Sequence, residues 1–175
     1  MRTIQPIARF DLAVSLLFLQ HRFNQDVARV SKAISHTGDG HLYGVIGLIS
    51  WWVDKDLGTV FLAVGLLAFA IELPIYWFAK NSFKRKRPEE FSSQLTSFIT
   101  PSDKYSLPSG HTAAAFVMAT LLGHFYPQFY VIYFLWASLI GISRILLGVH
   151  FLTDVLVGVV LGIGSTTLAI QLAGV

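Results

Sequence analysis

His150 and Asp154 are four residues apart at the start of an apolar segment, where ionisable side chains are costly. A helix would place them on one face, within hydrogen-bonding reach. A carboxylate bound to one imidazole nitrogen fixes the tautomer and leaves the other nitrogen free as a nucleophile or base. The alternative is a His–Asp pair that only caps a helix. A location within a membrane segment favours the functional interpretation.

A second histidine follows a short polar stretch, Pro108-Ser109-Gly110-His111, and precedes an apolar run. A helix that begins at Gly110 or His111 presents unpaired N–H groups, which form an anion site. The Ser109 hydroxyl can donate to an anion, and Gly110 lets the backbone approach closely. His111 would then give a proton to a leaving group. The alternative is an ordinary N-cap beside an exposed histidine.

Four cations are candidates for binding a dianionic phosphate. Lys80 and Arg87 are seven residues apart, so a helix that continued to Pro88 would place them, with Lys84 between, on one face. Arg144 comes from another apolar segment. Arg binds phosphate in a planar fork and Lys as a point charge. The alternative is a basic run that only sets membrane topology.

The composition predicts the elements that position these residues. Of 175 residues, 54% are hydrophobic and 13% charged, which excludes an ordinary soluble domain. We expect an integral membrane protein with one domain over residues 1–175. The chain has no cysteine, which excludes disulfides and thiolate chemistry. The net charge of +3 is concentrated near residues 80–88, which favours lipid headgroups over nucleic acid.

Apolar runs predict an all-α polytopic membrane bundle of five to six transmembrane helices. The expected spans are residues 40–53, 57–79, 111–126, 128–147 and 150–175. This order of crossings places the loop 80–110 and the turn 143–154 on the same side of the membrane. The histidines and the cations should therefore meet at one end of the bundle.

Residues 1–35 are predicted to form an N-terminal interfacial segment rather than a sixth span. Residues 10–19 are too short to cross regularly. Farther along, apolar side chains recur at helical spacing with basic side chains on the other faces, which is typical of an interfacial amphipathic helix. The apolar positions are Phe23, Val27, Val30 and Ile34, and the basic ones are Arg22, Arg29 and Lys32.

Together these residues form three motifs: KxxxxxxRP at residues 80–88, PSGH at 108–111 and SRxxxxxHxxxD at 143–154. In order and internal spacing the motifs resemble those of the type 2 phosphatidic acid phosphatase family, and they cover residues 80–154. The resemblance implies a metal-independent phosphatase or diphosphatase without a cofactor. It also implies that His150 forms a phosphohistidine, that Asp154 orients His150, and that His111 exchanges protons with the leaving group and water. The residues implied to hold the phosphoryl oxygens are Lys80, Arg87, Ser109, Gly110 and Arg144.

A site at the membrane surface favours a lipid phosphate as substrate, with the bilayer as the other partner and no obligate protein partner. The sequence does not choose between undecaprenyl pyrophosphate, phosphatidylglycerol phosphate, phosphatidic acid and a lipid A phosphate. The alternatives are a lipid phosphotransferase and a non-enzymatic lipid-binding membrane protein. The basic loop would be cytoplasmic by the positive-inside rule, whereas the resemblance favours an outward site. We expect a bacterial inner membrane with the site facing the periplasm.

Several other polar residues have no assigned chemistry. Glu72 either lines a lipid tunnel, pairs with a cation or is structural. Asp39, in the stretch 34–41, is interpreted as a helix cap. Three cations, Lys84, Arg85 and Lys86, are expected to attract anionic lipid without doing chemistry. Partners are not predicted for three histidines, His21, His36 and His124.

Overall fold

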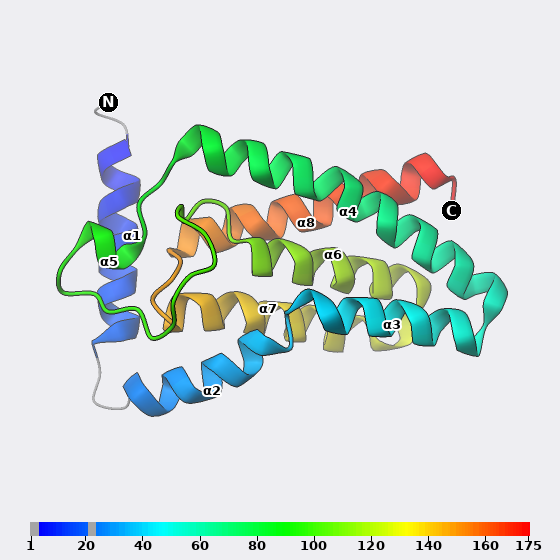
Figure 1. Ribbon diagram of the computed structural model, residues 1–175, viewed down its shortest axis with the longest axis horizontal. Helices are drawn as coiled ribbons and strands as arrows, with labels where there is room; N and C mark the ends of the chain where they lie inside the picture. Colours follow the sequence, from blue (N-terminus) through cyan, green and yellow to red (C-terminus); the bar gives the residue numbers. More distant parts are fainter. Residues whose placement is uncertain (1–3, 21–23) are drawn as a thin grey trace.

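The computed structural model describes residues 4–20 and 24–175, and within these ranges the regular structure is entirely helical (Figure 1). The predicted all-α class is therefore confirmed for the described residues. The helices are α1 (Ile4–Leu19), α2 (Asn24–His36), α3 (Gly40–Val53), α4 (Lys55–Phe83), α5 (Pro88–Phe91), α6 (Gly110–Phe125), the 3-10 helix η1 (Pro127–Phe129), α7 (Tyr130–Leu146) and α8 (Leu152–Ala173).

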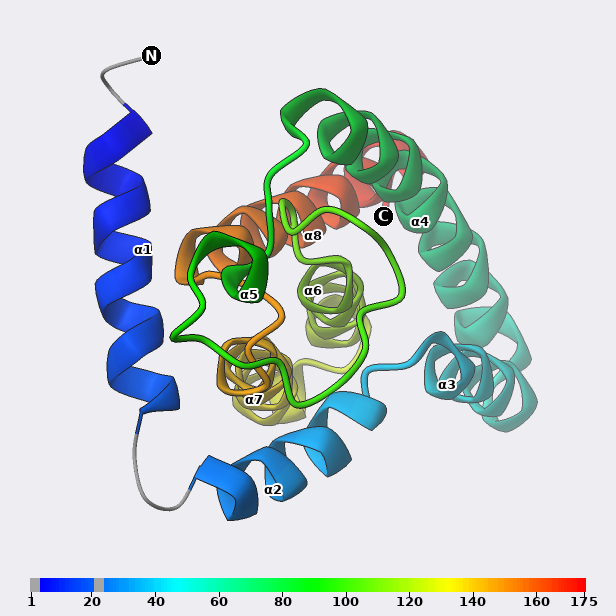
Figure 2. The same cartoon turned by 60° about the vertical axis from the view of Figure 1, so that its left-hand side comes forward.

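Helix α6 forms the centre of the bundle, and α4, α7 and α8 pack around it (Figure 2). Its small side chains make this possible, since Ala113, Ala115 and Ala119 are fully buried. On α8, a Cβ added at Gly162 would lie 2.4 Å from the carbonyl oxygen of Ala113. The α6–α8 contact therefore depends on the absence of a side chain there.

In the described part of the chain, three segments are long and apolar enough to cross a membrane: 55–91, 127–146 and 152–173. The predicted spans over α3 and α6 are helices of 14 and 16 residues. At 1.5 Å per residue, 16 residues extend about 24 Å, less than the roughly 30 Å of a bilayer core. The number of crossings, five or six, therefore stays a prediction.

The exit of α4 differs from the prediction. Asp54 caps the start of the helix by accepting hydrogen bonds from the N–H groups of Asp56 and Leu57. The helix ends at Phe83, because Lys84 adopts a left-handed conformation with φ of 46°. The expectations that the helix runs to Arg87 and that Lys84 shares its face are wrong: Lys84 is exposed.

Helices α1 and α2 lie at the end of the bundle that carries the motifs. In both views α1 crosses this end roughly perpendicular to the other helices (Figures 1 and 2). Helix α2 packs against α7, with Val27 and Ile34 partly buried and Val30 exposed. Arg22 and Phe23 of the predicted amphipathic pattern lie outside the described residues, as does His21. An interfacial location for both helices stays a prediction.

Candidate active site

The segment between α4 and α6 passes over the start of α6 (Figure 2). A cavity of about 230 Å³ is lined by residues of this segment and of the start of α6. It brings together five of the eight predicted site residues, from four separate segments. These are Arg87, Gly110, His111, Arg144 and His150. The expectation that the loop 80–110 and the turn 143–154 meet at one end agrees with this arrangement. The other three residues, Lys80, Ser109 and Asp154, are not among the residues that line it.

A tight turn brings His150 next to Arg144. Helix α7 ends at Leu146 with Leu147 as its C-cap, and Gly148 follows with φ of 72°, a conformation that favours glycine. The N–H groups of Val149 and His150 then both donate to the Arg144 carbonyl, at 3.3 Å each. His150 is 3% exposed, and this burial lowers its pKa to about 4, more than the nearby Asp154 carboxylate can offset. An imidazole with this pKa is uncharged at neutral pH, which is the state that the predicted nucleophilic role requires.

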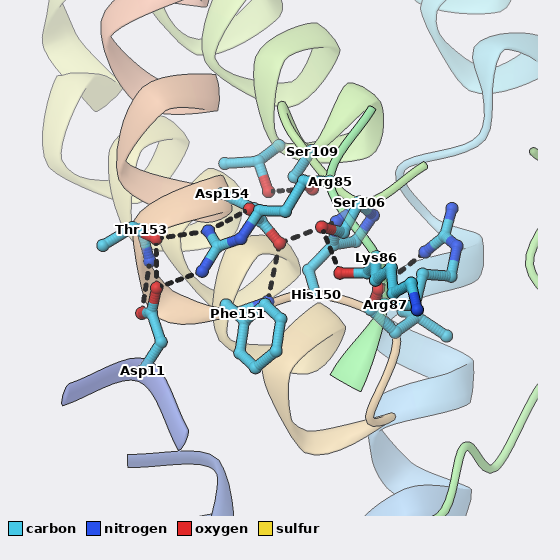
Figure 3. A network of polar contacts seen from close by, with 12 residues as sticks. Asp11, Arg85, Lys86, Arg87, Ser106, Ser109, His150, Phe151, Thr153 and Asp154 are labelled. Carbon is cyan, nitrogen blue, oxygen red and sulfur yellow. Dashed lines mark hydrogen bonds and ion pairs between the residues drawn. The ribbon is translucent and has the colours of Figure 1, made fainter. Parts of the chain in front are cut away.

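Asp154 lies near His150, but the predicted hydrogen bond between them is not formed. His150 Nδ1 and Asp154 Oδ2 are 3.7 Å apart, and Nδ1 has no hydrogen-bond partner among the described residues. The physical reason is that α8 begins only at Leu152, so His150 is not on the helix. Asp154 Oδ2 instead accepts the N–H of Phe151 at 2.8 Å and closes the first turn (Figure 3).

The cations Lys80 and Arg87 converge on the carboxylate of Asp103. Lys80 Nζ donates to Asp103 Oδ2 at 2.7 Å and to the Tyr76 hydroxyl at 2.7 Å. Arg87 Nη2 donates to Asp103 Oδ1 at 2.5 Å, and Nη1 to the Val149 carbonyl at 2.6 Å. Burial alone would raise the pKa of Asp103, but hydrogen bonds from Lys80 and Tyr76 outweigh it and hold the pKa below its usual value.

His111, at the start of α6, contacts a carboxylate from the α2–α3 turn. Its Nε2 lies 3.1 Å from Asp39 Oδ1, and Asp39 Oδ2 lies 2.6 Å from His36 Nδ1. Asp39 occupies the N-cap position of α3 but makes no capping hydrogen bond with its side chain. The interpretation of Asp39 as a cap is therefore wrong for its side chain, which contacts the two histidines instead.

Arg144 is 5% exposed and reaches the cavity from the end of α7. Its Nη1 donates to the Ser35 hydroxyl at 2.6 Å, whereas its Nε has no hydrogen-bond partner in the part of the chain that the structure describes. A buried unpaired donor in a cavity wall is available to a ligand oxygen. On its other side Arg144 borders an open groove of about 990 Å³ that also has Arg29, Lys32 and His36 along α2.

Ser109 and Gly110 shape the start of α6. Ser109 is the N-cap residue, and α6 begins at Gly110 as predicted. The Ser109 side chain is fully buried, with its hydroxyl 2.8 Å from that of Thr112, so it does not face the cavity in this state. Its N–H donates to the Asp154 carbonyl at 3.1 Å. A Cβ added at Gly110 would lie 3.0 Å from the Tyr76 ring, so glycine permits this close approach.

Four residues around the site are not among the defining positions of the three motifs. Tyr76 and Glu72 line the cavity from α4, one and two turns before Lys80. Asp103 comes from an irregular loop, and Arg85 from the basic run, where it contacts Asp154. Helical spacing from Lys80 identifies Tyr76 and Glu72 as facing the same way. No periodic pattern identifies Asp103, because it lies in a loop.

The geometry suits binding a phosphoryl group between cations and exchanging protons beside it. Two guanidinium groups, two imidazoles and the N-terminus of α6 border one small cavity. In the described part of the chain, no three His, Cys, Asp or Glu side chains lie close enough together to share a metal ion.

Comparison with known proteins gives the same family from sequence and structure. The PAP2 superfamily matches residues 56–174. The lipid A 1-phosphatase of Rhizobium etli is 30% identical over 117 residues, covering 63% of this chain and 46% of the relative. The crystal structure of Aquifex aeolicus LpxE aligns with a TM-score of 0.79 and 28% identity, covering 91% of this chain and 94% of that one.

A second solved structure, the first transmembrane PAP2 type phosphatidylglycerolphosphate phosphatase from Bacillus subtilis, aligns with a TM-score of 0.75 and 26% identity. The alignment covers 97% of this chain and 87% of that chain. The chain spans about half the length of the curated relatives it matches, 46% to 55% for three of them. From the family match, the apolar helices and these structures, the chain is an integral membrane protein that belongs to the PAP2 superfamily.

Proposed function

We propose that the protein is a metal-independent phosphatase of membrane lipids that acts through a phosphohistidine. One observation carries the proposal: a buried His150 shares a small cavity with Arg87, Arg144 and His111. Phosphoryl transfer requires positioning and charge stabilisation more than any other contribution, and this cavity offers both.

In the first step, His150 Nε2 attacks phosphorus. A nitrogen–phosphorus bond forms as the bond to the leaving oxygen breaks, and His111 gives that oxygen a proton. Asp154 lies beside Nδ1 of His150 and stabilises the positive charge that develops on the ring. The phosphoryl oxygens are held by Arg87, Arg144 and N–H groups of the first turn of α6, which begins at Gly110.

In the second step, His111 takes a proton from water as the water oxygen attacks phosphorus. The nitrogen–phosphorus bond breaks, inorganic phosphate leaves, and His150 is regenerated. Lys80 contributes its charge once Asp103 has moved aside. Ser109 supports this end of α6 through Thr112 and becomes a phosphate ligand only if its hydroxyl rotates toward the cavity.

The substrate is proposed to be a lipid phosphomonoester or diphosphate. The relatives are named for lipid A 1-phosphate and phosphatidylglycerol phosphate, which makes these two the first substrates to test. The groove beside Arg144 carries three further cationic or titratable side chains of α2. Its size, about 990 Å³, favours a large anionic headgroup such as that of a lipid A phosphate over the small headgroup of phosphatidic acid.

The site is proposed to face the periplasm of a bacterial inner membrane. The turn between α3 and α4 at Asp54 lies at the opposite end of the bundle from the motifs (Figure 1). A reporter enzyme inserted in this turn would then be active in the cytoplasm. Reporter activity only in the periplasm would reverse the orientation.

The function is tested by measuring phosphate release from purified protein in detergent across a panel of lipid phosphates, with His150→Ala as the blank. We expect release from at least one lipid, loss of at least ~1000-fold in the variant, and an acid-labile phosphoprotein in the wild type only. Transfer of the phosphoryl group to a second lipid with no inorganic phosphate would indicate a phosphotransferase. Binding without any turnover would indicate a non-enzymatic protein.

A further inference from the structure

Asp154 is held from behind by a guanidinium group that belongs to none of the three motif positions. Arg85 Nη1 donates to Asp154 Oδ1 at 2.6 Å, on the opposite carboxylate oxygen from the one nearest His150 (Figure 3). Asp154 is fully buried. A buried carboxylate is stable in its charged form only when it is paired and hydrogen bonded, and Arg85 provides the charge.

The same guanidinium reaches a second buried carboxylate, on α1. Arg85 Nη2 donates to Asp11 Oδ2 at 2.5 Å, and Asp11 is also fully buried. Asp11 accepts from the N–H and the hydroxyl of Thr153, at 3.1 and 2.5 Å, while Arg85 Nη1 donates to that hydroxyl at 2.6 Å. Arg85 therefore joins α1 to the first turn of α8, where Asp154 lies.

The position of Arg85 is itself constrained. Its guanidinium carbon lies 4.4 Å from the centre of the Phe151 ring, and its carbonyl accepts the N–H of Ser106 at 2.9 Å. A planar fork that stacks on an aromatic ring and donates to two carboxylates is a geometry that lysine cannot reproduce. Its neighbour Lys86 is exposed.

We infer that Arg85 and Asp11 are positioning residues for the reaction, and that they orient the Asp154 carboxylate beside His150. Asp11 lies outside residues 56–174, which match the family, so α1 contributes to the site from beyond the matched region. This inference rests on the proposed function, since it assigns a role within that reaction. A shift of a carboxylate by about 1 Å is enough to reduce turnover by ~100-fold.

The kinetic test compares Arg85→Gln, Arg85→Lys and Asp11→Asn with Lys86→Gln as the matched control. We expect Arg85→Gln to lower kcat ~100-fold with KM changed less than ~3-fold, Arg85→Lys to recover only part, and Asp11→Asn to lower kcat ~10-fold. The control stays within ~2-fold. An increase in KM with unchanged kcat would mean that Arg85 binds the lipid instead, and would overturn the inference.

Coupling and rescue separate positioning from a general loss of structure. If Asp11 acts through Arg85, the double variant with Arg85→Gln and Asp11→Asn has the same kcat as Arg85→Gln alone. If the two residues act independently, their separate losses in kcat multiply. Millimolar methylguanidinium should raise the kcat of an Arg85→Ala variant at least ~5-fold. It should leave the kcat of Lys86→Gln unchanged. Multiplied losses, or no rescue of a variant that still folds, would contradict the inference.

A readout without turnover keeps the inference distinct from the proposed function. Amide hydrogen exchange at Phe151, which donates to Asp154, and at Thr153, which donates to Asp11, should accelerate at least ~10-fold in Arg85→Gln and Asp11→Asn. Unchanged exchange would overturn the inference even if the wild type releases phosphate. If the exchange changes but the wild type hydrolyses no lipid phosphate, the proposed function fails while the α1–Arg85–Asp154 link stands.

Discussion

Asp103 Oδ2 accepts a hydrogen bond from Lys80 Nζ at 2.7 Å. A carboxylate of the protein therefore pairs with the ammonium group that, by the family resemblance, is expected to bind phosphate. Its other oxygen accepts from Arg87. The phosphoryl group must therefore displace Asp103 or share these donors with it. The negative charges of the phosphoryl group and of Asp103 repel each other when both lie beside Lys80 and Arg87, and this repulsion weakens phosphate binding.

Replacing Asp103 with Asn should tighten the binding of inorganic phosphate. The amide keeps the shape of the side chain but removes the competing charge, so we expect the inhibition constant of phosphate to fall ~3- to 10-fold. Without phosphate the variant should be less stable, because Lys80 and Arg87 lose their counter-charge. The melting temperature should then rise more with added phosphate than it does for the wild type.

Glu89→Gln is the matched control for this change, because Glu89 is an exposed carboxylate at the same end of the bundle. It should alter neither phosphate inhibition nor melting temperature by a measurable amount. If phosphate bound more weakly to Asp103→Asn than to wild type, Asp103 would be organising the donors for the ligand rather than competing with it.

Low pH should destabilise the protein through His150. Its pKa is lowered to about 4 in the folded state and is close to 6.5 when unfolded. Between these values the unfolded chain binds a proton that the folded chain does not, so the free energy of unfolding falls as pH decreases from about 6.5 to about 4. Denaturant titrations in detergent should show a steeper loss for wild type than for His150→Gln.

Asp103 changes the stability in the same direction but in a different pH window. Its pKa lies below the ordinary 3.8, so its stabilising contribution is present above that value and is lost only as pH falls through the folded-state pKa. The slope between pH 6.5 and 4 is therefore not due to Asp103, and Asp103→Asn should leave it unchanged. Equal slopes for wild type and His150→Gln would show that His150 is not the group responsible.

Replacing Asp39 with Asn should slow proton transfer by His111. The carboxylate lies 3.1 Å from His111 Nε2 and favours the protonated ring. We expect kcat to fall ~10-fold and the alkaline limb of the pH–rate profile to move to lower pH. The control is Asp26→Asn on α2, where Asp26 contacts the exposed Arg29. A lower kcat with an unmoved alkaline limb would make Asp39 structural.

The sequence predicts the helical bundle and five of the residues that line the cavity, because apolar runs and motif spacing indicate helices and their ends. Gly110 begins α6 as predicted, and the motifs meet at one end. The sequence does not predict the carboxylates that contact the predicted site residues. Asp103 lies in an irregular loop, and Asp11 is 143 positions before Asp154, so their contacts arise from tertiary packing rather than from any local period.

Local geometry was also mispredicted where one residue changes the path of the chain. The left-handed conformation of Lys84 ends α4 early, and this turn directs Arg85 toward Asp154 rather than toward lipid. Likewise the late start of α8 leaves His150 and Asp154 3.7 Å apart. Neither backbone feature follows from residue types. Lysine seldom adopts a positive φ, so nothing in the sequence indicates the conformation of Lys84.

The hydrocarbon chain of the substrate is expected to lie in an apolar groove of about 340 Å³ between α3 and α4. Phe69 borders both this groove and the small cavity, so the two lie next to each other. A Cβ at Gly44, on the groove wall, meets no atom within 4 Å, so Gly44→Phe can fill the groove without a backbone clash. We expect KM for a long-chain lipid phosphate to rise ~10-fold.

The same variant should hydrolyse a short-chain, water-soluble phosphate ester as fast as the wild type does, because the cavity with His150 and Arg87 is unchanged. Gly164→Phe on α8 is the matched control, since Gly164 is exposed and its Cβ position is equally open. It should leave KM for both substrates within ~2-fold. If Gly44→Phe weakened both substrates equally, the change would have reached the phosphate cavity. If it weakened neither, the chain would lie elsewhere on the bundle.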